Sequence, residues 1–93
     1  MTPIIKDPEA LLRYAIVWPP GVTDGAAITS AQWSVEPDEP GGVATSAHFI
    51  GGSETGAQFG GGIAGRVYRA ICHVALSDGR SADRSLVIRV EQR

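Results

Sequence analysis

The most informative part of this chain is residues 60–80, which read Gly60-Gly61-Gly62-Ile63-Ala64-Gly65-Arg66-Val67-Tyr68-Arg69-Ala70-Ile71-Cys72-His73-Val74-Ala75-Leu76-Ser77-Asp78-Gly79-Arg80. Every second residue from Tyr68 to Leu76 is apolar, which predicts a strand with one buried face after a glycine bend. Asp78-Gly79 predicts a primed hairpin turn in which both residues have positive φ. Leu86, Ile88 and Val90 alternate in the same way, so both strands of this hairpin are expected to face one core.

The rest of the chain also divides into short alternating segments separated by turn residues. We expect an edge strand at residues 4–5, interrupted by Lys6-Asp7-Pro8, and a second strand that Pro19-Pro20-Gly21 stops. Asp24-Gly25 predicts a turn, and the acidic, proline-rich residues 36–42 predict a surface loop. Trp33 is expected at the centre of the core. We also expect a short strand at residues 57–59. The expected inward side chains of the other strands are Leu12, Tyr14, Ile16 and Trp18; Ala31, Trp33 and Val35; and Thr45, Ala47 and Phe49.

These segments indicate an all-β fold: one immunoglobulin-like or fibronectin-like β-sandwich of about seven antiparallel strands, forming a single domain over residues 1–93. Gly65-x-x-Tyr68 stands where such domains carry a tyrosine corner, with Trp33 packed nearby. Ala70 occupies the position that is cysteine in antibody domains, and Cys72 is the only cysteine, so we expect no intrachain disulfide. A helix over residues 8–17 is the alternative, but Tyr14 and Ile16 favour a strand.

Composition and charge narrow the possible functions. The chain has 93 residues, 43% hydrophobic and 19% charged, as in a folded globular protein. No segment predicts a membrane helix or an export signal, and a net charge of −2 gives no support for nucleic-acid binding. Residues 1–54 carry seven acidic and two basic side chains, whereas residues 55–93 carry three acidic and six basic ones. Two interpretations of this asymmetry stay open: solvated faces that complement each other, or a polar docking surface.

The order of these elements resembles that of the bacteriophage fibre-tail adaptor proteins. Residues 19–25 depart from this pattern, which has an aromatic-containing segment at that place. The conformation of this loop and the partner that it meets therefore stay open. The segments that carry the resemblance are Lys6-Asp7-Pro8, Tyr14-Ala15-Ile16-Val17-Trp18, Ser30-Ala31-Gln32-Trp33-Ser34-Val35, Gly61-Gly62-Ile63-Ala64-Gly65-Arg66-Val67-Tyr68, Ser77-Asp78-Gly79-Arg80 and Leu86-Val87-Ile88-Arg89-Val90.

The resemblance implies a structural protein of a phage or prophage particle that binds other head, tail or fibre proteins and is not an enzyme. It implies a homo-oligomer in the particle, present in the host cytoplasm during assembly, with no cofactor, nucleic acid or membrane as partner. From the alternation we expect four side chains of the strand after the glycine bend to point outward: Val67, Arg69, Ile71 and His73. The set is unusually apolar for a solvated face, and it is our candidate for part of a contact surface. Ordinary exposed aliphatic side chains are the competing interpretation.

Three other functional hypotheses carry less support. A capsid decoration or adhesion module would need exposed aromatic side chains, for which Trp18 and Phe59 are the candidates. The glycine run lacks the lysine and the following helix of a phosphate loop, and Cys72 and His73 point to opposite faces of one strand. Glu36, Asp38 and Glu39 could hold calcium, although acidic loop residues beside prolines are usually only solvated.

Overall fold

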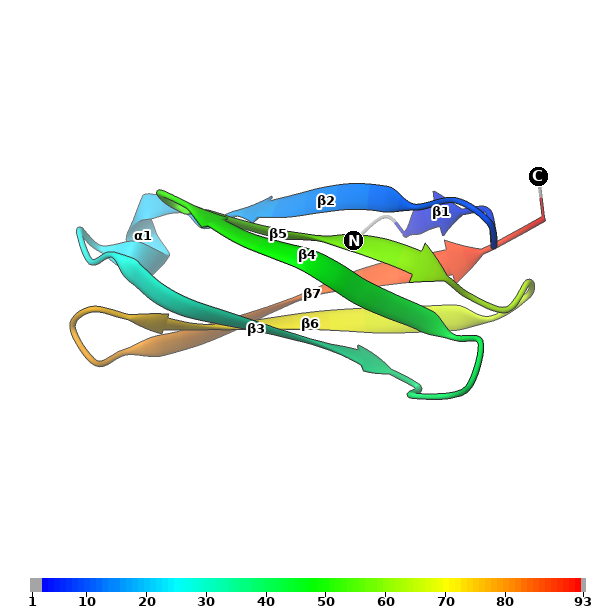
Figure 1. Ribbon diagram of the computed structural model, residues 1–93. Helices are drawn as coiled ribbons and strands as arrows, with labels where there is room; N and C mark the ends of the chain where they lie inside the picture. The colour runs from blue at the N-terminus through cyan, green and yellow to red at the C-terminus, as the bar shows by residue number, and fades with distance from the viewer. Residues whose placement is uncertain (1–2, 93) are drawn as a thin grey trace.

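The computed structural model describes residues 3–92, which form two facing β-sheets in an elongated molecule of 42 × 23 × 18 Å (Figure 1). The four-stranded sheet has the order β1 (Ile4–Lys6), β7 (Ser81–Val90), β6 (Val67–Leu76), β3 (Ile28–Glu36). The three-stranded sheet has the order β2 (Leu12–Val17), β5 (Glu54–Gly61), β4 (Val43–Gly51).

The strand order is that of an immunoglobulin-like sandwich, which confirms the predicted fold class. The second, fifth and fourth strands form one sheet, and the third, sixth and seventh strands form the other, as in constant-type domains. All neighbouring strands are antiparallel except β1, which lies parallel to β7 at the sheet edge. Cys72 is a free, buried thiol, so packing replaces the disulfide of antibody domains.

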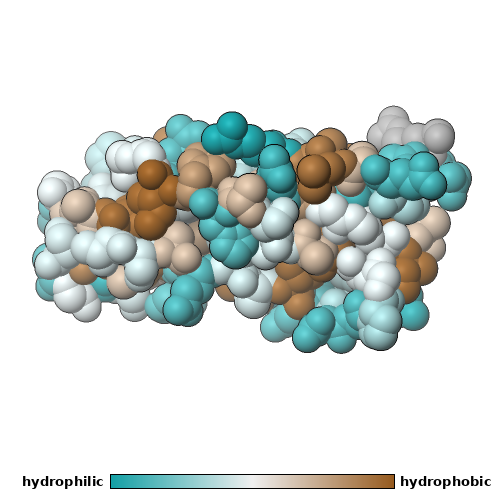
Figure 2. All heavy atoms as spheres, in the orientation of Figure 1, coloured by the Kyte–Doolittle hydropathy of each residue, from teal (hydrophilic) through white to brown (hydrophobic). Residues whose placement is uncertain are grey.

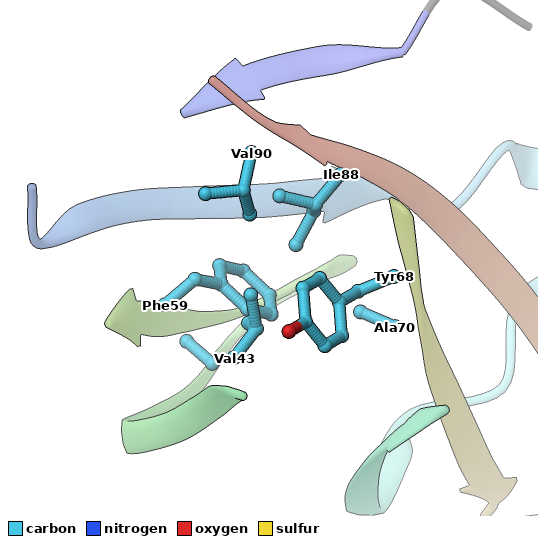
Figure 3. Packing of buried hydrophobic residues seen from close by; sticks show 7 residues of the cluster. Val43, Phe59, Tyr68, Ala70, Ile88 and Val90 are labelled. Carbon is cyan, nitrogen blue, oxygen red and sulfur yellow. The ribbon is translucent and has the colours of Figure 1, made fainter. Parts of the chain in front are cut away.

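The inward side chains of β6 form the spine of the core, as their alternation predicts. Tyr68, Ala70, Cys72 and Val74 have no exposed surface, and Leu76 is 4% exposed. They divide between two clusters. Figure 3 shows one of them, in which Phe59 and Val43 of the three-stranded sheet meet Tyr68, Ile88 and Val90 of the other. The second cluster contains Ile16, Trp18, Ile28, Cys72, Val74 and Leu76.

Trp18, rather than Trp33, is the fully enclosed tryptophan. Trp18 is 2% exposed, and its indole N–H donates to Thr55 Oγ1 at 2.9 Å. Trp33 contacts both clusters but is only partly buried, because it lies on the edge strand β3 and the sheet does not cover its outer side. The expectation that Trp33 occupies the centre of the core is therefore wrong, because β3 is the edge strand beside β6 and not a central strand.

A bulge in β4 reverses the expected side-chain directions in the second half of that strand. Ala47 has a φ of 49°, and the register shifts between Ser46 and Phe49. Phe49 consequently lies over Gly56 on the outer face, where the Arg13 guanidinium is 4.3 Å from the centre of its ring. Of the inward set expected here, Thr45 faces the core beside Phe59, whereas Ala47 and Phe49 do not.

The hairpin between β6 and β7 is one residue longer than predicted. Gly79 has a φ of 90°, but Asp78 is not among the residues with positive φ. The Gly79 N–H donates to the Leu76 carbonyl, and the Leu76 N–H donates to the Arg80 carbonyl, at 3.1 and 2.8 Å. This is a three-residue loop, a turn followed by a left-handed glycine, rather than a two-residue primed turn. Asp78 instead accepts hydrogen bonds from the Arg80 main chain and side chain.

A short helix, α1 (Pro20–Thr23), was not expected from the sequence. Pro20 suits the first helical turn because its missing N–H would have no helical partner there. Asp24 and Gly25 both have positive φ and end the helix, so the predicted turn is present. Arg80 donates to the carbonyl oxygens of Val22 and Thr23, which ties the helix to the hairpin loop.

Candidate docking surfaces

The candidate contact residues of β6 lie on the outer face of the four-stranded sheet. Val67 is 52% exposed, Arg69 and His73 are exposed, and Ile71 is half-buried. The side chains of His73 and Asp83 are hydrogen-bonded across β6 and β7. His73 is thus held by a neighbouring carboxylate at one end of this face.

Sheet register adds residues to this face that alternation along one strand could not identify. Arg69 lies opposite Val87, and Val67 lies opposite Arg89, which in turn lies beside Ile5 of β1. The outer face therefore carries four apolar side chains that alternate with two arginines: Arg89 lies between Ile5 and Val67, and Arg69 lies between Val67 and Ile71 and opposite Val87. On the face in view in Figure 2, the brown apolar residues form separate patches between polar groups.

Tyr68 lies at the corner where the glycine bend meets the 36–42 loop. Its hydroxyl accepts the Ile63 N–H at 3.1 Å and donates to the Glu39 carboxylate at 2.8 Å. This is the hydrogen bond of a tyrosine corner, from the ring back to the main chain a few residues upstream. Burial raises the pKa of the Tyr68 hydroxyl, and Glu39 raises it further. Gly65 donates to the Val90 carbonyl at 2.8 Å, and a Cβ at Gly62 would lie 2.7 Å from the Val90 side chain.

Lys6 is buried, which the sequence analysis missed. It is 1% exposed, and Nζ donates to the carbonyl oxygens of Gly61 at 2.6 Å and Asp7 at 2.9 Å. Burial lowers the pKa of Lys6, and the nearby Asp7 charge opposes that shift. The Lys6-Asp7-Pro8 segment is therefore attached directly to the glycine bend. The sequence did contain one signal for the burial of Lys6: Lys6 is two residues after Ile4 in the same strand, so both side chains point to the core.

Side chains that could do chemistry are dispersed over the molecule. Cys72 is buried beside the Thr55 hydroxyl, and burial raises the pKa of its thiol. His73 lies on the outer face, and His48 is hydrogen-bonded to Thr45 on the other sheet. Within residues 3–92, no group of three or more His, Cys, Asp or Glu side chains is arranged to hold a metal ion. Glu39, one of the three acidic residues considered for calcium, is occupied by the Tyr68 hydroxyl.

Two further observations bear on the alternatives. Trp18 and Phe59 are 2% and 1% exposed, so the aromatic side chains considered for an adhesion surface are in the core instead. Among residues 3–92, no helix has the length and apolarity needed to cross a membrane.

The fold, the tyrosine corner and the Lys6 contact involve the same segments that carry the resemblance to phage adaptors. A family model, described as Podophage GP4 fiber-tail adaptor protein gp77, matches residues 6–89. The chain belongs to this family. The matched region begins at the buried Lys6 and reaches into β7, so it covers both sheets. No curated protein matches the chain. The fibre-tail adaptor family places the protein among structural components of the phage virion that bind other tail or fibre proteins.

Proposed function

We propose that this adaptor works by binding alone, as a single immunoglobulin-like domain, and catalyses no reaction. The observation that carries the proposal is the family match over nearly the whole chain. The dispersed positions of Cys72, His48 and His73 are consistent with it, since a nucleophile and its base must lie within hydrogen-bond reach of each other.

The contact face we propose is the outer face of the four-stranded sheet. Val67, Arg69, Ile71 and His73 form its centre, and Ile5 and Val87 extend it. Exposed aliphatic side chains beside arginines are typical of protein interfaces, in which an apolar centre has a polar margin. The partner would be another head, tail or fibre protein of the virion.

We also propose that several copies act together in the particle as a homo-oligomer, and that the protein is in the host cytoplasm during assembly. Repetition strengthens a weak contact because each additional contact in a ring forms between groups that are already held close together. Neither nucleic acid nor membrane is part of this proposal, because the net charge is −2 and Arg69 and Arg89 are flanked by carboxylates rather than gathered into a basic surface.

The test compares two exposed valines on opposite outer faces. Val67→Glu places a charge within the proposed contact face, whereas Val17→Glu places one on the three-stranded sheet, at 64% exposure. Both variants should fold, since both side chains point into solvent. Mass spectrometry of purified particles should then show loss of the Val67→Glu protein and normal incorporation of Val17→Glu.

Two results would contradict the proposal at different levels. If parental protein is absent from complete particles, the protein is not a virion component in them. If Val67→Glu is incorporated as well as the parent, the protein is a component but binds through another surface.

A further inference from the structure

A cleft of about 280 Å³ opens between the two edge strands β3 and β4. Trp33 and Val35 of β3 and Val43 of β4 provide apolar surface in the cleft. The remaining lining residues are Ser34, Asp38, Ala44 and Thr45. The volume suits one or two side chains of an incoming segment rather than a whole folded domain.

Trp33 has an unmet hydrogen-bonding requirement. Its ring packs edge-on against Phe59, with centroids 5.3 Å apart. Its Nε1 is shielded from solvent and has no hydrogen-bond partner among the described residues. A buried donor without an acceptor is unfavourable, because it has lost its hydrogen bond to water. A carbonyl oxygen brought to the Trp33 indole by an occupant of the cleft would remove that cost.

The edge of β3 beside the cleft is open to strand addition. β3 pairs only with β6. Its one register shift lies at its start, between Ile28 and Ser30, and from Ser30 to Val35 it contains no charge, proline or bulge. Natural sheet edges usually carry such features because they prevent unwanted pairing. The facing edge strand β4 has one, the bulge at Ala47. An unprotected edge next to an apolar cleft is the arrangement that binds an extended peptide by adding it to the sheet.

The charge at the mouth of the cleft indicates what the occupant carries. Asp38 lines the cleft and is exposed, and it makes no ion pair or side-chain hydrogen bond with any residue from 3 to 92. Glu36, at the end of β3, is not part of this site, because it lies opposite Arg69 on the outer face of the sheet. A lysine or arginine on the incoming segment would complement the Asp38 carboxylate.

We propose that the cleft and the free edge of β3 bind one extended segment of another virion protein. The segment pairs with β3, places an aliphatic side chain against Trp33, Val35 and Val43, and directs a basic side chain to Asp38. This inference rests on the proposed binding function and gives the adaptor a second attachment surface. The outer sheet face holds one partner, and the cleft holds a flexible segment of the same or another partner.

The test uses overlapping synthetic peptides that cover the tail and fibre proteins of the particle that contains this protein. The full chain, labelled with nitrogen-15, has two indole N–H signals, from Trp18 and Trp33. A peptide bound in the cleft should shift the Trp33 signal and slow its hydrogen exchange. The Trp18 signal should not move, because its N–H is already bonded to Thr55.

Charge variants add a second readout. Asp38→Lys should weaken binding of such a peptide about tenfold, as expected for loss of one favourable charge pair and gain of an unfavourable one. Glu9→Lys makes the same change of charge at an exposed site outside the cleft and should leave the affinity unchanged.

Three results would overturn the inference. Peptides could leave the Trp33 signal in place, they could shift only the outer-face residues, or the signal could shift with protein concentration alone, which would indicate a second copy in the cleft. If any of these occurs while the protein is still found in particles, the cleft inference fails and the proposed function stands. Absence from particles would reject the proposed function itself.

Discussion

The Tyr68 hydroxyl connects segments that lie far apart in the chain. It takes a hydrogen bond from the glycine bend at Ile63 and gives one to Glu39 in the loop between β3 and β4. The Tyr68 side chain therefore holds the loop to the bend together with the main-chain hydrogen bond from the Gly62 N–H to the Gly41 carbonyl. Because the hydroxyl is buried, each of its hydrogen bonds replaces one that water would otherwise supply.

Removing this hydroxyl should destabilise the protein without changing its fold. Tyr68→Phe leaves the Ile63 N–H and the Glu39 carboxylate without their partner, so we expect a loss of about 1–3 kcal/mol in the free energy of unfolding. Tyr14→Phe is the control, because Tyr14 is 40% exposed and water can replace its contacts. Urea unfolding of both variants measures the difference, and equal stability would show that the corner bond contributes nothing.

Thr55 has a similar role in the second cluster of the core. Thr55→Val removes the acceptor of the Trp18 indole N–H while keeping the side-chain volume. We expect a loss of about 1–3 kcal/mol, because a buried donor is left unpaired. Thr55→Ser keeps the acceptor and loses only a methyl group, at about 1 kcal/mol. If urea unfolding shows Thr55→Val to be the more stable of the two, the bond to Trp18 is not important.

At the scale of the elements, β4 shows where sequence patterns fail. Its residues alternate plausibly, yet the bulge at Ala47 moves Phe49 from the expected inner face to the outer one. A bulge leaves no marker in this segment, because Ala47 is neither glycine nor asparagine. The strand β6 has no such irregularity, and there the alternation predicts every buried residue.

Gly56 gives a test of the Phe49 position. A Cβ at Gly56 would lie 2.3 Å from the Phe49 ring, so Gly56→Ala must displace the ring or the main chain. We expect a loss of about 1–3 kcal/mol from overpacking. Gly51→Ala, at the hairpin end of the β4–β5 pairing, has no heavy atom within 4 Å of its added Cβ and should be close to neutral. Urea unfolding of the two variants compares them directly. Tolerance of alanine at both sites would mean that Phe49 does not lie over Gly56.

At the scale of the whole molecule, the fold and the surfaces differ in how far the sequence predicts them. The period-two pattern and the turns are local, so they predict seven strands and a sandwich. The partly exposed position of Trp33 and the buried Lys6 depend on which strands are sheet edges and which strand faces which, and that follows from tertiary packing. The direction of Val67 and Ile71 was predictable from alternation, whereas Ile5, Val87 and the cleft needed the sheet order.

The burial of Cys72 and Tyr68 makes stability depend on alkaline pH. Burial raises the pKa of both groups, from ordinary values of 9.0 and 10.0, so the folded state keeps protons that the unfolded chain releases. Their contribution to stability is complete below those values and is lost as pH rises above them. Each group gives a slope of at most about 1.4 kcal/mol per pH unit. Lys6 acts in the opposite sense, because its lowered pKa favours folding as pH rises towards 10.5.

Comparison of variants with the parent separates these contributions, since Lys6 is present in all of them. Under reducing conditions, Cys72→Ala should lose less stability than the parent from pH 9 upward, and Tyr68→Phe should do so from pH 10 upward. Below pH 8 the curves should run parallel, whatever constant stability each substitution removes. Urea unfolding at a series of pH values measures the slopes. Parallel curves over the alkaline range would mean that neither group is held in its protonated form by burial, and that the core admits water beside β6.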